Sequence, residues 1–202
     1  TVATGDVEVK RSNWTIEAGK ISLFETGDGN YRMVASGDVS YMEKDVSFAG
    51  KELEAIFRRQ GEETIPTEIS FEDFSGSFDQ IETMGGGGKL NFSRGNLQSI
   101  SLTRAPEINY KDYKLKGESI FVKKVDRGVD LQASSARFIS GSRDYQISAE
   151  RFELLLVREE GGFRGEEASG SSLKGSFPFK TESGKRKKLY FSSDEIKMIY
   201  DK

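Results

Sequence analysis

Apolar and polar residues alternate through much of the chain, and the alternation changes phase at regular places. One recurring segment reads apolar, x, apolar, x, small, x, x, apolar, x and then usually apolar. Alternation with a period of two predicts strands with one buried face. Three residues, not two, lead from the small residue to the next apolar one, so we expect a bend or bulge there. Copies of this segment begin at Trp14, Val46, Tyr113, Val129, Tyr145 and Leu189.

The copies recur at fixed distances along the chain. Trp14 and Val46 are 32 residues apart, and the same distance separates Gly5 from Gly37 in two matching Gly-Asp-Val segments. The three copies in the middle of the chain follow one another at steps of 16 residues. A fixed period of this size indicates a stacked, repeat-built architecture. Ordinary antiparallel hairpins without a repeat are the alternative.

These patterns predict an all-β chain, built as an open β-jelly roll or flattened solenoid of stacked bent strand pairs. The best helix candidate, Lys51–Arg59, aligns with a strand in the earlier copy, so we expect a strand there. We treat residues 1–202 as a single repeat-built β-jelly-roll domain. The glycine run at 85–88 is either a flexible tip or a joint that divides the chain into 1–84 and 89–202.

The apolar positions of the pattern are expected to line the inside of a two-walled sandwich or roll. If the walls meet, the interior is a dry core; if they splay, it is an apolar groove for acyl chains. The sequence leaves both arrangements open. The candidate lining residues are Trp14, Ile16, Ile21, Leu23, Val46, Phe48, Leu53, Leu115, Ile120, Val122, Leu131, Phe138, Ile147, Phe152, Leu154, Phe191, Ile196 and Met198.

A serial stack of strands leaves two sheet edges. We expect these candidate assembly edges near Val7 and Val9, and near Ile196 and Tyr200. Unpaired edges invite strand addition by a partner or by a second copy of the chain.

Two further segments are ambiguous. Glu159–Gly175 is rich in Gly and Glu, and we expect a long, poorly ordered tip there. Lys185-Arg186-Lys187-Lys188 is the only basic run. It is either a contact for an anionic headgroup or phosphate or, as we favour, a solvated hairpin tip.

Composition narrows the class of protein. The hydrophobic share is 35%, below that of an average domain, which suits sheets with one wet face. The formal net charge of −3 gives no electrostatic reason to expect nucleic-acid binding. No apolar run is long enough to span a membrane. The chain begins on a strand-like segment, so we expect that processing removed a signal sequence.

The residues for catalysis are sparse. The chain has no Cys and no His, which excludes disulfides and thiolate metal sites and removes the commonest general base. Asp6 and Asp38 recur after glycine at strand starts, where Asp typically shapes a turn. We therefore expect no enzyme activity, no metal and no cofactor.

Four segments carry a resemblance to a known family. They are Gly5–Ile21, Gly37–Leu53, Ile147-Ser148-Ala149-Glu150-Arg151-Phe152 and Phe191-Ser192-Ser193-Asp194-Glu195-Ile196. These strand pairs resemble the OstA-like family of periplasmic lipopolysaccharide-transport proteins. The resemblance implies an open β-jelly roll that shields acyl chains and joins edge to edge in outer-membrane biogenesis. It implies a non-enzymatic periplasmic protein whose partners are a lipid or lipopolysaccharide-like glycolipid and other jelly-roll components or itself.

Two other functions remain open. One is a closed-core structural or assembly module of the cell envelope that binds no lipid. The other is a carbohydrate-binding sandwich, which requires exposed aromatic side chains on an outer face. The residues to examine for that role are Tyr31, Tyr41, Tyr110 and Tyr145.

Overall fold

The chain folds into antiparallel strands, as the alternation predicts. The computed structural model describes residues 1–11, 13–27, 29–142, 144–181 and 185–199. These residues form fourteen strands and no helix, so the all-β prediction is confirmed. The chain divides into two compact units, Thr1–Arg104 (unit 1) and Ala105–Lys202 (unit 2).

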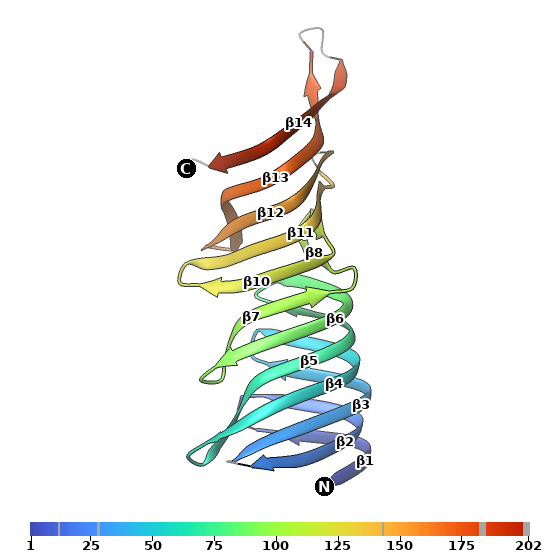
Figure 1. Cartoon of the computed structure of the whole chain (residues 1–202), viewed down its shortest axis with the longest axis vertical. Coiled ribbons are helices and arrows are strands. Elements are labelled where there is room, and N and C mark those ends of the chain that lie inside the picture. Colours follow the sequence, from blue (N-terminus) through green and yellow to red (C-terminus); the bar gives the residue numbers. More distant parts are fainter. Residues whose placement is uncertain (12, 28, 143, 182–184, 200–202) are drawn as a thin grey trace. The chain divides into compact units, whose positions relative to one another are not determined.

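In unit 1 each strand pairs with the next along the chain (Figure 1, blue to green). Its strands are β1 (Val2–Lys10), β2 (Thr15–Gly27), β3 (Asn30–Glu43), β4 (Val46–Gln60), β5 (Glu63–Phe78), β6 (Ile81–Ser93) and β7 (Asn96–Thr103). Strand β1 therefore ends the sheet of this unit.

In unit 2 the order is β10 to β14, and β9 pairs with both β8 and β11 (Figure 1). Its strands are β8 (Glu107–Tyr110), β9 (Tyr113–Lys116), β10 (Ser119–Val125), β11 (Gly128–Ser140), β12 (Tyr145–Glu159), β13 (Gly162–Lys180) and β14 (Arg186–Ile199). Strands β9 and β10 lie end to end against β11, because β9 pairs with 137–140 and β10 with 128–134.

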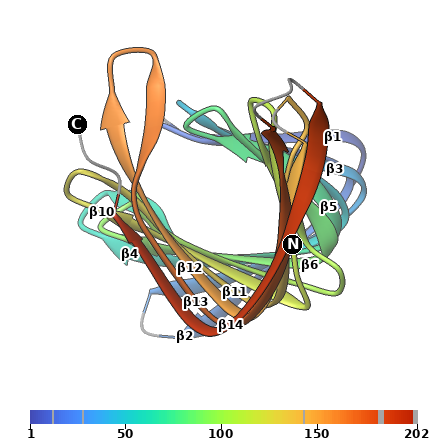
Figure 2. The same cartoon turned by 90° about the horizontal axis from the view of Figure 1, so that it is seen from above.

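The bends lie where the sequence predicts a change of phase. In β3 the pairs Ser36↔Glu52 and Val39↔Gly50 leave two residues of β3 opposite one of β4, which is a β-bulge. Asp38 there has a φ of 49°, in the left-handed region. Phe48 and Leu53, on either side of the bend in β4, are both buried. Strand β14 is also bent, and its two arms diverge in Figure 2, although its pairing with β13 shows no shift of register.

The glycine run is neither a flexible tip nor a joint. Gly85–Gly88 lies inside strand β6, and the boundary between the units follows Arg104. A Cβ on Gly88 would lie 3.0 Å from the ring of Phe74, and one on Gly86 would lie 2.9 Å from the Cβ of Arg104. Glycine is used here because neighbouring side chains occupy the space above the strand.

The expected tip at 159–175 is also wrong over most of its length. Strand β13 begins at Gly162 and pairs with both β12 and β14. Its Gly175 accommodates the ring of Phe191, since a Cβ at this position would meet that ring. Small residues therefore hide the alternation of β13 in the sequence. In contrast, the strand expected at Lys51–Arg59 is confirmed as part of β4.

Candidate functional site

The interior of unit 1 is closed by aromatic contacts between two walls. The bend in each strand separates two arms, and the arms of neighbouring strands form two walls. Wall A contains Val46–Ala49 of β4 and the residues of the other strands that pair alongside them. Wall B contains Glu52–Gln60 of β4 and the residues that pair alongside those. Phe48 of wall A and Phe71 of wall B have ring centroids 6.0 Å apart. The ring centroids of Trp14, on the wall A side, and Phe57 of wall B are 4.9 Å apart. The walls of this unit therefore meet over a packed core.

Most of the lining residues predicted in unit 1 belong to this closed core. Those that are buried are Trp14, Ile16, Ile21, Val46, Phe48 and Leu53. Leu23 differs, because 37% of its surface is exposed. Leu23 is opposed by Met33 of β3 on one side, and on the other side its backbone is hydrogen-bonded to Thr1. Directly opposed residues share a face, so Leu23 points to the same side of the sheet as the buried Met33, with part of its surface exposed.

Unit 2 has a closed part and an open part. Predicted lining residues in its closed part are Leu115, Ile120, Val122 and Leu131, all buried. At this end Tyr110 of β8 reaches across to the start of β13. Its ring packs edge-on against Phe163 with centroids 5.8 Å apart, and its hydroxyl oxygen accepts a hydrogen bond from the Phe163 amide.

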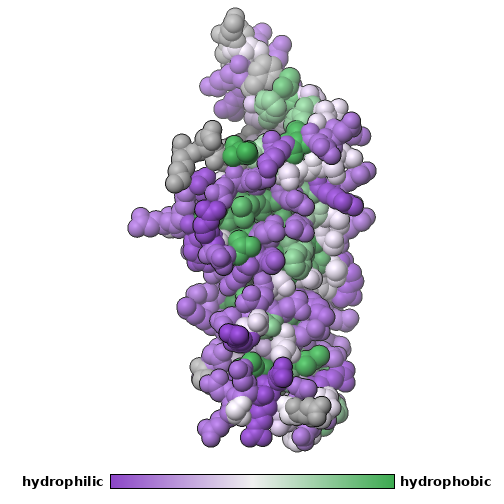
Figure 3. Space-filling view, turned by 60° about the vertical axis from the view of Figure 1, so that its left-hand side comes forward, coloured by the Kyte–Doolittle hydropathy of each residue, from purple (hydrophilic) through white to green (hydrophobic). Residues whose placement is uncertain are grey.

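Towards β14 the interior of unit 2 opens into an apolar groove of about 490 Å³. This volume is within the range of small-molecule sites. The predicted residues Phe138, Ile147, Leu154, Phe191, Ile196 and Met198 line it and are only half-buried. Buried Phe152 lines it too. Hydrophobic side chains reach the surface of unit 2 in the upper half of Figure 3.

Both arms of the bent strands contribute to the groove. Ile147 precedes the bend of β12 and Leu154 follows it, while Phe191 and Met198 flank the bend of β14 in the same way. At one end Phe138 stacks with Tyr113, Tyr145 and Phe152 at centroid distances of 5.7, 5.9 and 5.6 Å. The groove is therefore the inner side of the bend.

Small inward-facing residues of β13 explain why the groove is open. Ala168 lies between Leu154 and Met198, and Gly170 lies between Phe152 and Ile196. Directly opposed residues in antiparallel strands point to the same face, so these small side chains face the interior. In unit 1, by contrast, β5 fills the corresponding space with the buried residues Ile69, Phe71, Phe74 and Phe78.

The groove offers burial and no charge. Its remaining lining residues are Tyr145, Ala168, Ser176, Phe177, Ser192 and Ser193, so every lining side chain is uncharged. Two lysines of β14 have ion pairs: Lys188 with Asp144 at 3.1 Å and Lys197 with Glu167 at 2.7 Å. Such a surface can hold an apolar chain by removing it from water and contains no nucleophile with an adjacent base.

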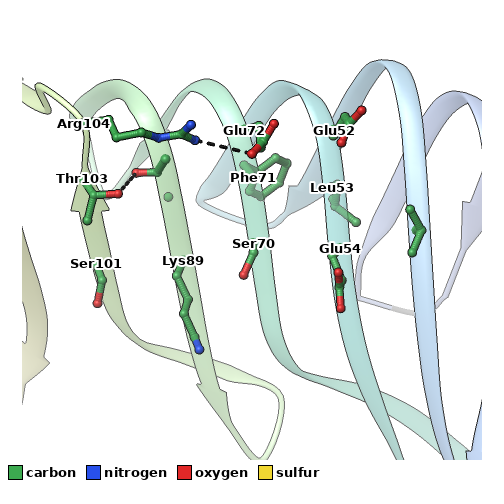
Figure 4. A pocket seen from close by; sticks show the side chains of 13 residues that line it. Glu52, Leu53, Glu54, Ser70, Phe71, Glu72, Lys89, Ser101, Thr103 and Arg104 are labelled. Carbon is green, nitrogen blue, oxygen red and sulfur yellow. Dashed lines mark hydrogen bonds and ion pairs between the residues drawn. The ribbon is translucent and has the colours of Figure 1, made fainter.

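A second depression, in unit 1, has charged and polar side chains beside Val34, Leu53 and Phe71 (Figure 4). Two of its carboxylates, those of Glu54 and Glu72, have ion pairs. Glu54 accepts two hydrogen bonds from Arg32, at 2.7 and 2.9 Å, and these bonds lower the pKa of its carboxyl group. Arg104 extends towards Glu72, with 3.8 Å between nitrogen and oxygen. These four charged side chains are solvent-exposed.

Three of the four residues predicted at the assembly edges lie within the described part of the chain. Strand β1 ends the sheet of unit 1, and its Val7 and Val9 are half-buried. Strand β14 is the last strand in the order of unit 2, and its Ile196 faces the groove. Tyr200 lies outside the described residues.

The four tyrosines named for sugar binding do not form an exposed set. Tyr41 and Tyr110 are buried, and Tyr31 and Tyr145 are half-buried. The Tyr41 hydroxyl donates to Glu43 at 2.6 Å, and burial together with this bond raises the pKa of Tyr41. The side chain of Tyr41 therefore belongs to the core.

The described residues lack two further features. No group of three or more Asp and Glu side chains within them has an arrangement suited to a metal ion. Among the same residues there is no helix of the length and apolar character needed to cross a membrane.

Sequence reasoning missed several lining residues of the groove. Tyr145 and Ser193 are members of the repeated segment, at its first and small positions, and that membership was the available signal. Phe177 and Ala168 lie in β13, whose alternation is obscured by small residues.

No protein-family model matches this chain, and none of the curated proteins matches it either.

Proposed function

We propose that this protein is a non-enzymatic carrier that shields the acyl chains of a lipopolysaccharide-like glycolipid in the periplasm. The observation that carries the proposal is the uncharged groove of about 490 Å³ between the two arms of β11 to β14. Each methylene group buried there would contribute about 0.8 kcal/mol. The resemblance to the OstA-like family of lipopolysaccharide-transport proteins supports the same function.

The proposed architecture is an open β-jelly roll of stacked bent strand pairs. The serial pairing of bent strands and the phase change at each bend support it. In this arrangement the closed core of unit 1 gives rigidity, and the groove of unit 2 receives the ligand. We further propose that β1 and β14, the terminal strands of their units, join copies or related jelly-roll components by strand addition.

Lipid extraction tests the ligand. The purified full chain is extracted with organic solvent, and the extract is analysed by mass spectrometry. Titration with a fluorescent fatty acid then measures affinity. We expect co-purified lipid and saturable probe binding. A chain that carries no lipid and has no affinity for the probe contradicts the proposal.

A matched pair of variants tests the groove itself. Met198 lines the groove, whereas the adjacent Ile199 is 67% exposed. Met198→Glu places a charge where an acyl chain would lie, so probe affinity falls; Ile199→Glu leaves it unchanged. Thermal unfolding of both variants shows whether each is folded. Equal affinity of the two folded variants for the probe would place the lipid elsewhere.

The alternative is a closed-core assembly module of the cell envelope. The packed interior of unit 1, where Phe48 meets Phe71, favours it. It predicts no lipid uptake by the full chain, together with oligomers that lengthen with concentration in light scattering. Lipid uptake by a protein that stays monomeric would exclude it.

A further inference from the structure

The hairpin of β13 and β14 projects past the rest of the sheet in unit 2. Pairing between β12 and β13 reaches Gln146↔Ser176. From there β13 pairs only with β14 among the described residues, from Phe177↔Leu189 to Lys180↔Arg186. We call Phe177–Lys180 and Arg186–Tyr190 the hairpin ribbon. A two-stranded ribbon with no third strand is marginally stable in water, so binding to a partner would stabilise it.

The hairpin ribbon exposes large apolar side chains. The exposed fractions are 41% for Phe177, 47% for Leu189 and 76% for Tyr190. Phe177 and Leu189 are directly opposed and therefore share a face. Phe177 also lies 6.2 Å from Phe191, and both rings line the groove. The apolar face of the ribbon is thus continuous with the groove.

The hairpin ribbon and the residues that connect its two strands in the sequence are also strongly basic. Residues 180–188 contain five cations, Lys180, Lys185, Arg186, Lys187 and Lys188, and one carboxylate, Glu182, in the sequence. The five cationic side chains are exposed. Lys188 has an ion pair with Asp144 at 3.1 Å. A net positive charge therefore adjoins exposed apolar residues, in a chain whose overall charge is −3.

We propose that the hairpin ribbon docks on the surface of a bilayer that contains anionic lipids. Exposed Lys and Arg are attracted to anionic headgroups, and each contributes a factor of about five to partitioning. Leu189 and Tyr190 then enter the interfacial region, where amphipathic aromatic residues are favoured. Docking through these residues does not depend on the groove holding acyl chains. It would place the open end of the groove against the membrane.

Vesicle co-sedimentation of the full chain tests docking. The vesicles are phosphatidylcholine alone or phosphatidylcholine mixed with phosphatidylglycerol. We expect binding to the mixed vesicles only, and binding that weakens as salt rises. Replacing Lys185, Arg186 and Lys187 by Gln together should lower partitioning by a factor on the order of one hundred. Thermal unfolding checks that this variant is folded.

A matched charge control exists on another hairpin of unit 2. Replacing Lys123, Lys124 and Arg127 by Gln removes the same charge from the β10–β11 hairpin and should leave vesicle binding within about twofold, apart from the screened long-range attraction. If both triple variants lose binding equally, net charge and not the hairpin ribbon is responsible, and the proposal is wrong.

A spectroscopic variant reports insertion directly. The only natural tryptophan is the buried Trp14, so Tyr190→Trp adds a reporter on the hairpin ribbon. We expect its emission to shift to shorter wavelength on addition of mixed vesicles. The absence of a shift overturns insertion of the hairpin ribbon. A protein that binds soluble polyglutamate but neither kind of vesicle assigns the cations to an acidic macromolecule and overturns membrane docking.

Discussion

Phe48 and Phe71 face each other from opposite walls of unit 1, with their ring centroids 6.0 Å apart. Both are buried, and they join strands β4 and β5 on opposite sides of the bend. Since a packed aromatic pair contributes beyond its buried area, this contact is central to the closure of the unit 1 interior.

Truncation of Phe48 should strongly destabilise unit 1. Phe48→Ala removes a ring that no other side chain can replace, so we expect a loss of about 3–5 kcal/mol in the free energy of unfolding. Denaturant titration followed by Trp14 fluorescence measures it. Phe24→Ala, at a residue that is 47% exposed, should cost less than about 1 kcal/mol. Similar losses in the two variants would mean that the walls do not depend on this contact.

A methyl group at Gly76 should be poorly tolerated. A Cβ there would collide with the carbonyl oxygen of Ser47 and press on Phe48. Because the obstacle is backbone, Gly76→Ala should cost about 1–3 kcal/mol. In Gly19→Ala the nearest neighbour of the new Cβ is the Gly37 oxygen at 3.4 Å, which is ordinary contact, so the change should be near neutral. The midpoint of denaturant unfolding compares the two, and equal midpoints would contradict the close approach of β4 to β5.

Glu107 should make the stability of unit 2 depend on acid pH. Its carboxylate accepts hydrogen bonds from Lys114 and Lys116, with nitrogen–oxygen distances of 2.6 and 2.7 Å. These bonds lower the pKa of Glu107 from 4.5 to about 2. Because the pKa is lower in the folded state, the ionised carboxylate stabilises the folded protein. This contribution is fully present above about pH 4.5 and is lost as the pH falls towards 2.

The variant Glu107→Gln isolates this effect. At pH 7 we expect a lower midpoint of thermal unfolding than in the wild type, corresponding to about 1–2 kcal/mol. The difference should shrink on acidification and vanish near the folded-state pKa. Glu118→Gln, at an exposed residue of the same unit, is the control. A difference between wild type and Glu107→Gln that is independent of pH would rule out the ion pairs as its cause.

Filling the groove should block the proposed ligand without adding charge. Ile147 lines the groove, and Leu155 lies on the opposite face of the same strand. Ile147→Trp occupies part of the volume, so affinity for a fluorescent fatty acid should fall by at least about tenfold. Leu155→Trp should leave affinity unchanged. Retention of full affinity by folded Ile147→Trp would argue against the groove as the acyl site.

The sequence predicts the strands and their bends because both are local patterns. The phase change between Phe48 and Leu53 is visible in the residues themselves, and the structure buries both side chains. The strand at Lys51–Arg59 followed from the same alignment. In contrast, β13 and the glycines of β6 have small residues where the pattern requires large ones. Their inward positions are filled by neighbours such as Phe74 and Phe191, which no local pattern reveals.

The sequence does not predict whether the interior is closed or open, for a different reason. Contact between the walls depends on residues far apart in the chain, such as Trp14 and Phe57. The groove opens because Ala168 and Gly170 lie between larger residues of β12 and β14. Alternation identified most lining residues of the groove, but their accessibility follows from the size of cross-strand neighbours.

The interval of 32 residues from Gly5 to Gly37 has a consequence for how such a protein changes length during evolution. Two antiparallel strands return the chain to the same wall, in the same direction and with the same face inward. Duplication or deletion of a gene segment that encodes one such interval would therefore preserve every remaining strand pair. A chain built in this way can be lengthened or shortened in whole steps while its core keeps the same chemistry.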